Sequence, residues 1–317
     1  MTLENILEEV KKANTIVILT HENPDGDAIG SSLATYMILK SLGKEVDVII
    51  PEYPRVFNFL PCVDEIKKES SIENYDLAIS VDCATMNLLN GFGKYFENAK
   101  VKVTIDHHST NTMYGDYNYI NPDSPACAQV LLSILEYFDV EITKEVGTCL
   151  IAGIITDTGG FQYQSTNSET FEFASDLLKK GVNISDVYKK TMNTKSKSSF
   201  ELRKIAMNRM EFFEDSKISF TYITKQDVES VNGETGDCEG IVEEARSIEG
   251  VEVAIFIKEA KTNGYKCSLR SNDYVNVSDV CMMFGGGGHF HAAGCKMNLP
   301  LEQVKERIIN QVKMYIK

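Results

Sequence analysis

The sequence predicts an α/β protein in two parts, a doubly wound, mostly parallel sheet followed by a smaller α/β domain. Three observations lead to this fold class. The length of 317 residues fits about two domains of roughly 150 residues each. Short β-branched runs alternate with longer helix-like segments, as in parallel sheets covered by helices. A polar stretch over 189–199 has no apolar periodicity and separates two series of elements.

The first domain is expected over 1–188. It begins with a short amphipathic helix over 4–13 and a β-branched, buried strand over 15–20. The helix after this strand closes at Gly43. Further strands are expected at 46–50, 77–81 and 101–105, and helices at 28–42, 126–138, 142–156, 168–180 and 184–192.

A linker is expected over 189–203 and the second domain over 204–317. A helix from about 200 to 213 leads into that domain. Its strands are expected at 218–223, 251–258 and 265–270, and its helices at 238–247, 276–284 and 301–315.

Composition and charge narrow the function classes. No apolar run approaches the roughly 20 residues of a membrane span, and the acidic start lacks the features of a signal peptide. The eight cysteines are dispersed without a Cys-x-x-Cys pair, which fits a reducing compartment and argues against a structural zinc site. A cytoplasmic protein without membrane association is expected. The formal net charge of −14 argues against tight binding of long nucleic acid, but not against a small phosphate ligand.

All five histidines fall in three short clusters among acidic or glycine residues. These are His21-Glu-Asn-Pro-Asp25-Gly-Asp27, Asp106-His107-His108 and Gly288-His289-Phe-His291. Histidine is the commonest metal ligand and is suited to proton transfer near neutral pH. The clustering predicts one chemical site assembled from distant segments.

Three of the expected strands run into ligand-type residues, namely His21, Asp82 and the Asp106-His107-His108 run. A fourth apolar run, 151–156, ends at Asp157. Ligands of open α/β sheets bind outside the carboxyl ends of the strands. Each aspartate alone could be a helix cap or a turn residue. The conjunction of four segments favours a shared site.

The residue types indicate metal chemistry. Asp25 and Asp27 lie two apart in a Pro/Gly loop, so both carboxylates can face one cavity. The adjacent His107 and His108 diverge, so one can bind metal while the other faces a substrate. Mixed Asp and His ligands suit Mn²⁺, Fe²⁺ or Zn²⁺ better than Ca²⁺. Four aspartates would neutralise two divalent cations, which together can activate a water and hold a phosphoryl group.

Over about its first 185 residues, the chain resembles the DHH phosphoesterases. The matching motifs, in the family's order, are His21-Glu-Asn-Pro-Asp-Gly-Asp-Ala-Ile-Gly-Ser31, Val81-Asp82, Asp106-His107-His108 and Thr156-Asp157-Thr-Gly. The resemblance implies two divalent cations, with Mn²⁺ preferred to Mg²⁺ or Co²⁺. It implies one cation among His21, Asp25 and Asp82 and the other among Asp27, Asp82, His107 and Asp157. It also implies three catalytic roles: Asp82 bridges the cations, His108 faces the scissile phosphate, and Asp106 orients a histidine.

A second motif, Phe284-Gly-Gly-Gly-Gly288-His289, lies near the C-terminus. Consecutive glycines can present backbone N–H groups to an anion, although a flexible loop is the plain alternative. The motif resembles the Gly-Gly-Gly-His motif of the C-terminal domain associated with DHH proteins, and Ser268-Leu-Arg270-Ser271 resembles a strand of that domain. A surface salt bridge is the alternative for Arg270. The resemblance implies substrate binding by Arg270, Ser271, Gly286, Gly287, Gly288 and His289, and leaves His291 without a role.

With both motifs, the resemblance covers nearly the whole chain and points to the nano-RNase/pAp-phosphatase group. It implies hydrolysis of very short oligoribonucleotides to nucleoside monophosphates and removal of the 3′-phosphate of adenosine 3′,5′-bisphosphate (pAp). A cyclic- or linear-dinucleotide phosphodiesterase is an alternative; a family II pyrophosphatase is disfavoured because that group has a different C-terminal domain. A nucleotide-binding sensor without turnover is the alternative of another class. The expected partners are short oligoribonucleotides or a nucleoside bisphosphate, no long duplex, and a second copy as a homodimer.

Overall fold

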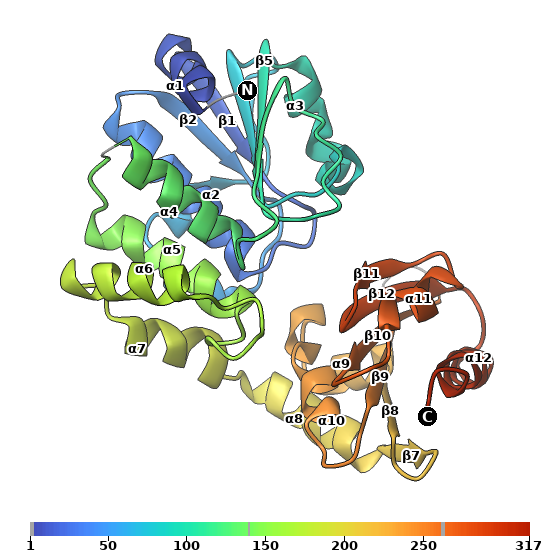
Figure 1. Cartoon of the computed structure of the whole chain (residues 1–317). Coiled ribbons are helices and arrows are strands. Elements are labelled where there is room, and N and C mark those ends of the chain that lie inside the picture. Colours follow the sequence, from blue (N-terminus) through green and yellow to red (C-terminus); the bar gives the residue numbers. More distant parts are fainter. Residues whose placement is uncertain (1–2, 139, 261–263) are drawn as a thin grey trace. The chain divides into compact units, whose positions relative to one another are not determined.

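The computed structural model describes residues 3–138, 140–260 and 264–317, and the chain divides into two compact units after Thr194. The first unit is built on a parallel sheet and the second on a mixed sheet, each covered by helices (Figure 1). The predicted α/β fold class is therefore confirmed.

Within the described residues, the sheet of the first unit has six parallel strands in the order β3-β2-β1-β4-β5-β6. Its strands are β1 (Thr15–Leu19), β2 (Glu45–Ile49), β3 (Ile66–Lys67), β4 (Leu77–Val81), β5 (Val101–Asp106) and β6 (Tyr117–Ile120). The order reverses between β1 and β4, and the carboxyl ends at such a switch point are where doubly wound sheets bind ligands. Both faces are buried, since Ile16 and Ile18 lie in one core and Val17 and Leu19 in another.

Helices cover the two faces of this sheet (Figure 1). The larger core joins the sheet to α1 (Leu3–Lys12), α2 (Gly26–Ser41), α4 (Cys127–Tyr137), α5 (Lys144–Asp157), α6 (Ser168–Lys179) and α7 (Ile184–Tyr188). On the other face, α3 (Gly93–Asn98) closes the smaller core. Helices α2 and α5 pack closely because Gly30 and Gly153 have no side chain: a Cβ on Gly153 would lie 2.5 Å from Oδ1 of Asp27.

The sheet of the second unit has the order β11-β12-β10-β9-β8-β7, in which β8 and β9 are parallel and the other neighbours antiparallel. Its strands are β7 (Glu211–Phe213), β8 (Ile218–Ile223), β9 (Val253–Glu259), β10 (Tyr265–Ser271), β11 (Gly287–His289) and β12 (Ala292–Met297). Its helices are α8 (Lys197–Asn208), α9 (Lys225–Ser230), α10 (Ile241–Arg246), α11 (Val277–Met282) and α12 (Leu301–Lys313).

The structure differs from the expected elements at several points, of which three bear on the predicted motifs and domain boundary. The helix expected to reach residue 213 ends at Asn208, because Glu211–Phe213 pair with β8 as an edge strand. Within the segment expected as a linker, a π-helical turn over Lys189–Asn193 continues α7, in line with the helix expected at 184–192. The next helix, α8, begins at Lys197 rather than near residue 200, and the side chain of Ser196 caps it. Part of the glycine run, for which a flexible loop was the plain alternative, forms β11 because it pairs with the small residues of β12. No helix in the described part of the chain is long and apolar enough to span a membrane.

Candidate metal centre

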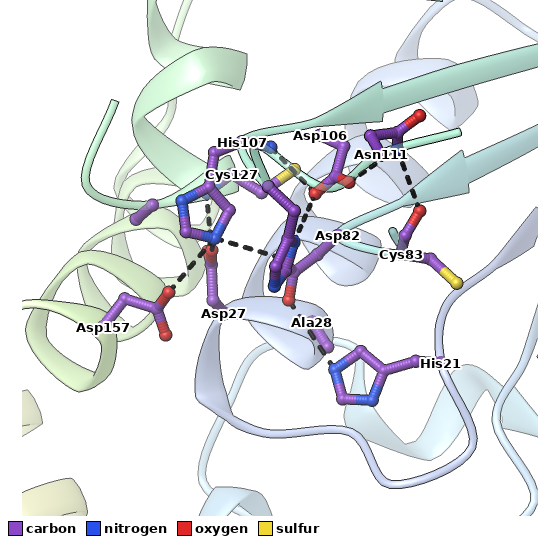
Figure 2. Close-up of polar contacts among 12 residues, drawn as sticks. His21, Asp27, Ala28, Asp82, Cys83, Asp106, His107, Asn111, Cys127 and Asp157 are labelled. Atoms are coloured by element: carbon purple, nitrogen blue, oxygen red, sulfur yellow. Dashed lines mark hydrogen bonds and ion pairs between the residues drawn. The ribbon is translucent and has the colours of Figure 1, made fainter. Parts of the chain in front are cut away.

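Three strands bring predicted ligand residues to one edge of the parallel sheet (Figure 2). His21 follows β1, Asp82 follows β4, and His107 follows β5. His21 Nε2 lies 3.8 Å from Asp82 Oδ2, and His107 Nε2 lies 3.5 Å from Asp82 Oδ1. The carboxylate of Asp82, which is 2% exposed, therefore lies between the two imidazoles.

Asp82 has a left-handed backbone, with φ of 51°. Its N–H donates to the carbonyl of Ile105 at 3.0 Å, so the backbone is held against the end of β5. Residues other than glycine rarely adopt this conformation, although Asp and Asn tolerate it best. The strained turn directs the Asp82 side chain towards the histidines rather than along the sheet.

Asp25 and Asp27 reach the site from the start of α2. Asp25 caps this helix, since its Oδ1 accepts the N–H groups of Asp27 at 3.0 Å and Ala28 at 3.1 Å. The fully buried Asp27 accepts the N–H groups of Cys127 at 2.5 Å and Ala128 at 2.9 Å. Because the N-cap residue of α4 provides no capping side chain, Asp27 caps that helix from 100 residues away. The backbone N–H groups at the start of α2 therefore hold the Asp25 carboxylate in place, and those at the start of α4 hold the Asp27 carboxylate.

His107 faces the carboxylate at the end of α5. Its Nε2 lies 3.3 Å from Oδ2 of Asp157 and 4.0 Å from Oδ2 of Asp27. Its Nδ1 lies 3.1 Å from the carbonyl oxygen of Ser124 and donates to it, since that oxygen only accepts. This bond directs Nε2 at the carboxylates, where the neutral ring presents its lone pair as a metal-binding histidine does.

The predicted ligands form two groups whose possible ligand atoms lie within 4.8 Å of one another. The groups are His21, Asp25 and Asp82, and Asp27, His107 and Asp157. Among the described side chains, the buried atoms Oδ1 of Asp82 and Nε2 of His107 have no hydrogen-bond partner. Two unpaired buried ligand atoms 3.5 Å apart fit a shared cation. The donor set of carboxylates and imidazoles fits a divalent metal ion.

Electrostatics supports the same interpretation. Burial, then the charges of Asp27 and Asp25, raise the pKa of Asp157 to about 8. Burial and the charge of Asp27 also raise the pKa of Asp82 well above its ordinary value. The buried carboxylates therefore disfavour one another's charge, and a divalent cation among them would remove this repulsion.

Asp106 lies behind this cluster and orients His108. The carboxylate is fully buried, and its Oδ1 accepts the N–H of His107 and Nδ1–H of His108, each at 2.8 Å. Its Oδ2 accepts from Nδ2 of Asn111 at 2.7 Å. Burial alone would raise the pKa of Asp106, but the bonds from His108 and Asn111 lower it. The sequence does not single out Asn111, because an asparagine in a loop carries no distinctive signal.

The predicted phosphate-binding residues lie in the second unit. Arg270 of β10 donates from Nε to Oε1 of Glu243 at 2.9 Å, so its guanidinium already holds a carboxylate. Ser271 is 1% exposed, and its Oγ lies 3.0 Å from Nδ1 of His291. His291, which had no assigned role, thus fastens the turn after β11 to the end of β10. Gly287, Gly288 and His289 form the edge strand β11, and Gly286 precedes it.

The chain belongs to the DHH family. The model for the DHH family N-terminal domain matches residues 15–154, and the model for the DHHA1 domain matches residues 217–317. The predicted resemblance is therefore confirmed.

Among its relatives is the bifunctional oligoribonuclease and PAP phosphatase NrnA of Thermus thermophilus, 31% identical over 97% of this chain and 93% of the relative. The probable NrnA of Streptococcus mutans is 27% identical over 92% of each chain. An exopolyphosphatase-related protein from Bacteroides fragilis shares the fold with a TM-score of 0.91 and 28% identity, over 99% of this chain and 96% of that one. RecJ of Thermus thermophilus, solved with Mn²⁺, shares the fold at 15% identity with a TM-score of 0.58, over 99% of this chain and 55% of that one.

Proposed function

We propose that this chain is a metal-dependent phosphoesterase that hydrolyses short oligoribonucleotides to nucleoside monophosphates and removes the 3′-phosphate of pAp. Relatives that match nearly the whole chain are named for both activities. The observation that carries the proposal is the pair of three-residue ligand groups, each of which contributes a buried atom without a hydrogen-bond partner, Oδ1 of Asp82 and Nε2 of His107. A cytoplasmic location and a homodimer stay predictions.

The proposed cofactor is a pair of divalent cations, with Mn²⁺ preferred to Mg²⁺ or Co²⁺. His21, Asp25 and Asp82 would hold one cation, and Asp27, Asp82, His107 and Asp157 the other. When bound, such a pair supplies an activated water and neutralises phosphoryl oxygens. The residues fit this role because the helix starts hold Asp25 and Asp27 in place, while Ser124 sets the tautomer of His107.

His108 is the proposed contact to the reacting phosphate. Its Nδ1 donates to the Asp106 carboxylate, so the ring must carry its proton on that nitrogen. The Nε2 atom is the proposed donor that stabilises charge on the phosphate or protonates the leaving oxygen. Burial would lower the pKa of His108, but the bond to Asp106 and the charge of Asp82 raise it, which favours the protonated form.

The second unit is proposed to bind a phosphate group of the substrate. Arg270 holds the carboxylate of Glu243 through Nε, and a guanidinium that binds carboxylate oxygens also suits phosphate oxygens. Gly286, Gly287, Gly288, His289 and Ser271 are the proposed neighbours of that phosphate. Replacement of Arg270 by Ala should raise KM and leave metal binding intact, whereas unchanged kinetics would remove Arg270 from the site. Glu243→Gln is the matched variant, because it keeps Arg270 and removes only the competing carboxylate.

The deciding experiment compares Mn²⁺-dependent turnover of a dinucleotide, pAp and a cyclic dinucleotide. Asp82→Asn keeps a residue that tolerates the left-handed backbone but weakens the metal ligand, so we expect a loss of on the order of 100-fold or more. His108→Ala should lose activity while retaining Mn²⁺. The exposed Asp116→Asn serves as the control. Equal activity of the wild type and Asp82→Asn would contradict the two-metal proposal, and binding without turnover would identify a sensor.

A further inference from the structure

We infer that Asn111 is a positioning residue for the proposed reaction. It fixes the Asp106 carboxylate, and through it the orientation and tautomer of His108. The inference rests on the proposed function, because it concerns the residue that would face the phosphate. It is carried by the hydrogen bonds of the loop that follows β5, all within the first unit.

The side-chain amide of Asn111 has one consistent orientation. Its Oδ1 accepts the N–H of Met113 at 2.7 Å, which places Nδ2 on the opposite side. Nδ2 donates to Oδ2 of Asp106 at 2.7 Å and to the carbonyl oxygen of Cys83 at 3.2 Å (Figure 2). The reversed amide would set an oxygen against a carboxylate and a carbonyl, which are both acceptors. Asn111 is thus a donor to Asp106.

The bond from Asn111 completes the hydrogen bonding of Asp106. One carboxylate oxygen, Oδ1, accepts from His107 N–H and from His108 Nδ1. The other, Oδ2, is the oxygen that Asn111 holds. Removal of the amide would leave Oδ2 buried without this donor, and the carboxylate could rotate. Rotation would release Nδ1 of His108, so that Nε2 would no longer be held towards a substrate.

Asn111 also joins the two strand ends that form the site. Its backbone N–H donates to the carbonyl of His108 at 3.1 Å, which closes the turn after β5. Its bond to the Cys83 carbonyl reaches the residue that follows Asp82, at the end of β4. One side chain therefore sets the spacing between the strained Asp82 turn and the Asp106–His108 pair.

Tyr114 provides a matched control. Its hydroxyl donates to the same Cys83 carbonyl at 2.9 Å and also bonds Ser80 Oγ at 2.7 Å. Tyr114→Phe therefore removes a bond at that carbonyl and leaves the Asp106 carboxylate untouched. A general loosening of the β4 end would affect both variants, whereas positioning of His108 would be lost with Asn111 alone.

The experiment measures dinucleotide hydrolysis at saturating Mn²⁺, with thermal unfolding as a check of the fold. Asn111→Ala should lower kcat on the order of 10- to 100-fold with little change in KM or Mn²⁺ affinity. The isosteric Asn111→Asp, which sets a carboxylate against Asp106, should lower kcat at least as much. Tyr114→Phe should keep kcat near the wild-type value. An equal loss in Tyr114→Phe would overturn the inference.

A double-mutant cycle with His108→Ala tests whether the loss of kcat in Asn111→Ala arises through His108. If Asn111 acts through His108, adding Asn111→Ala to His108→Ala should cost no further kcat. Losses that multiply would show that Asn111 acts elsewhere and would overturn the inference. The two proposals fail differently: a wild type without activity refutes the proposed function, whereas an Asn111→Ala variant with wild-type kcat refutes only the role of Asn111.

Discussion

Asp82 combines backbone strain, burial and charge in one residue. Its left-handed backbone costs on the order of 1–3 kcal/mol, and one of its buried oxygens has no hydrogen-bond partner among the described residues. Neither feature stabilises the folded chain. Both are explained if a cation pairs with this carboxylate, because the cation would satisfy the unpaired oxygen and offset its charge.

Metal binding should displace protons from this cluster. In the metal-free protein, burial and then the charges of Asp27 and Asp25 raise the pKa of Asp157 to about 8, so it holds a proton near neutral pH. Metals bind the deprotonated form, so the Mn²⁺ dissociation constant should rise as pH falls, by about tenfold per pH unit for each proton displaced.

Calorimetric titration of Mn²⁺ in two buffers with different ionisation enthalpies measures this proton release directly. The Asp157→Asn variant should release fewer protons than the wild type, because it lacks that titrating group. Identical heats in both buffers for the wild type would contradict the prediction. A lower Mn²⁺ affinity at higher pH would also contradict it, because the sign would be reversed.

The sequence predicted which residues come together at this edge of the sheet but not the contacts that hold them. Asp25, Asp82 and His107 stand at strand or helix boundaries, where a polar residue after an apolar run is visible in one chain. The cap that Asp27 provides to α4 spans 100 residues and depends on the packing of two helices. The contacts of Asn111 could not be predicted from the sequence for the same reason, since its partners Cys83 and Asp106 become neighbours only when β4 and β5 pair.

The contact between helices α2 and α5 supports the site. Gly153 of α5 faces Asp27, and an added Cβ would lie 2.5 Å from its Oδ1 and 2.8 Å from Cβ of Ala128. Gly153→Ala should therefore displace the Asp27 carboxylate. We expect a net loss of stability of about 1–2 kcal/mol, since overpacking exceeds the gain in helix propensity, together with weaker Mn²⁺ binding.

Denaturant unfolding and Mn²⁺ titration of Gly153→Ala check both effects. Gly91→Ala is the matched control in the same unit, because a Cβ there has no neighbour within 4 Å. A Gly153→Ala variant with wild-type stability and Mn²⁺ affinity would show that Asp27 does not depend on this close approach.

The sequence predicts a strand correctly where the strand is a separate apolar run. It does not predict a strand that forms only because its backbone pairs with neighbouring strands. The expected strands 77–81 and 218–223 coincide with β4 and β8. Strand β7 was absorbed into the preceding helix because its three residues, Glu-Phe-Phe, have no period of their own. Strand β12 begins with Ala-Ala-Gly, which has weak strand propensity, and forms because it pairs with β10 and β11.

The two units of the chain hold different kinds of side chain. The first holds the carboxylate and histidine cluster, and the second holds Arg270 and the glycine strand β11. The formal net charge of −14 repels a polyanion. The total repulsion is small for a substrate with few phosphates. Each added nucleotide brings another phosphate near the same negative charge, so the repulsion grows with length.

Activity should therefore fall sharply with oligonucleotide length. We expect the highest kcat/KM for dinucleotides and a steep decline beyond a few nucleotides in a series of single-stranded oligoribonucleotides measured at fixed Mn²⁺. The salt dependence for a dinucleotide should be shallow, with a log–log slope of about −0.7 for each phosphate neutralised and only a few phosphates engaged. A long single strand turned over as fast as a dinucleotide, or a steep salt dependence typical of many phosphate contacts, would contradict a site built for short substrates.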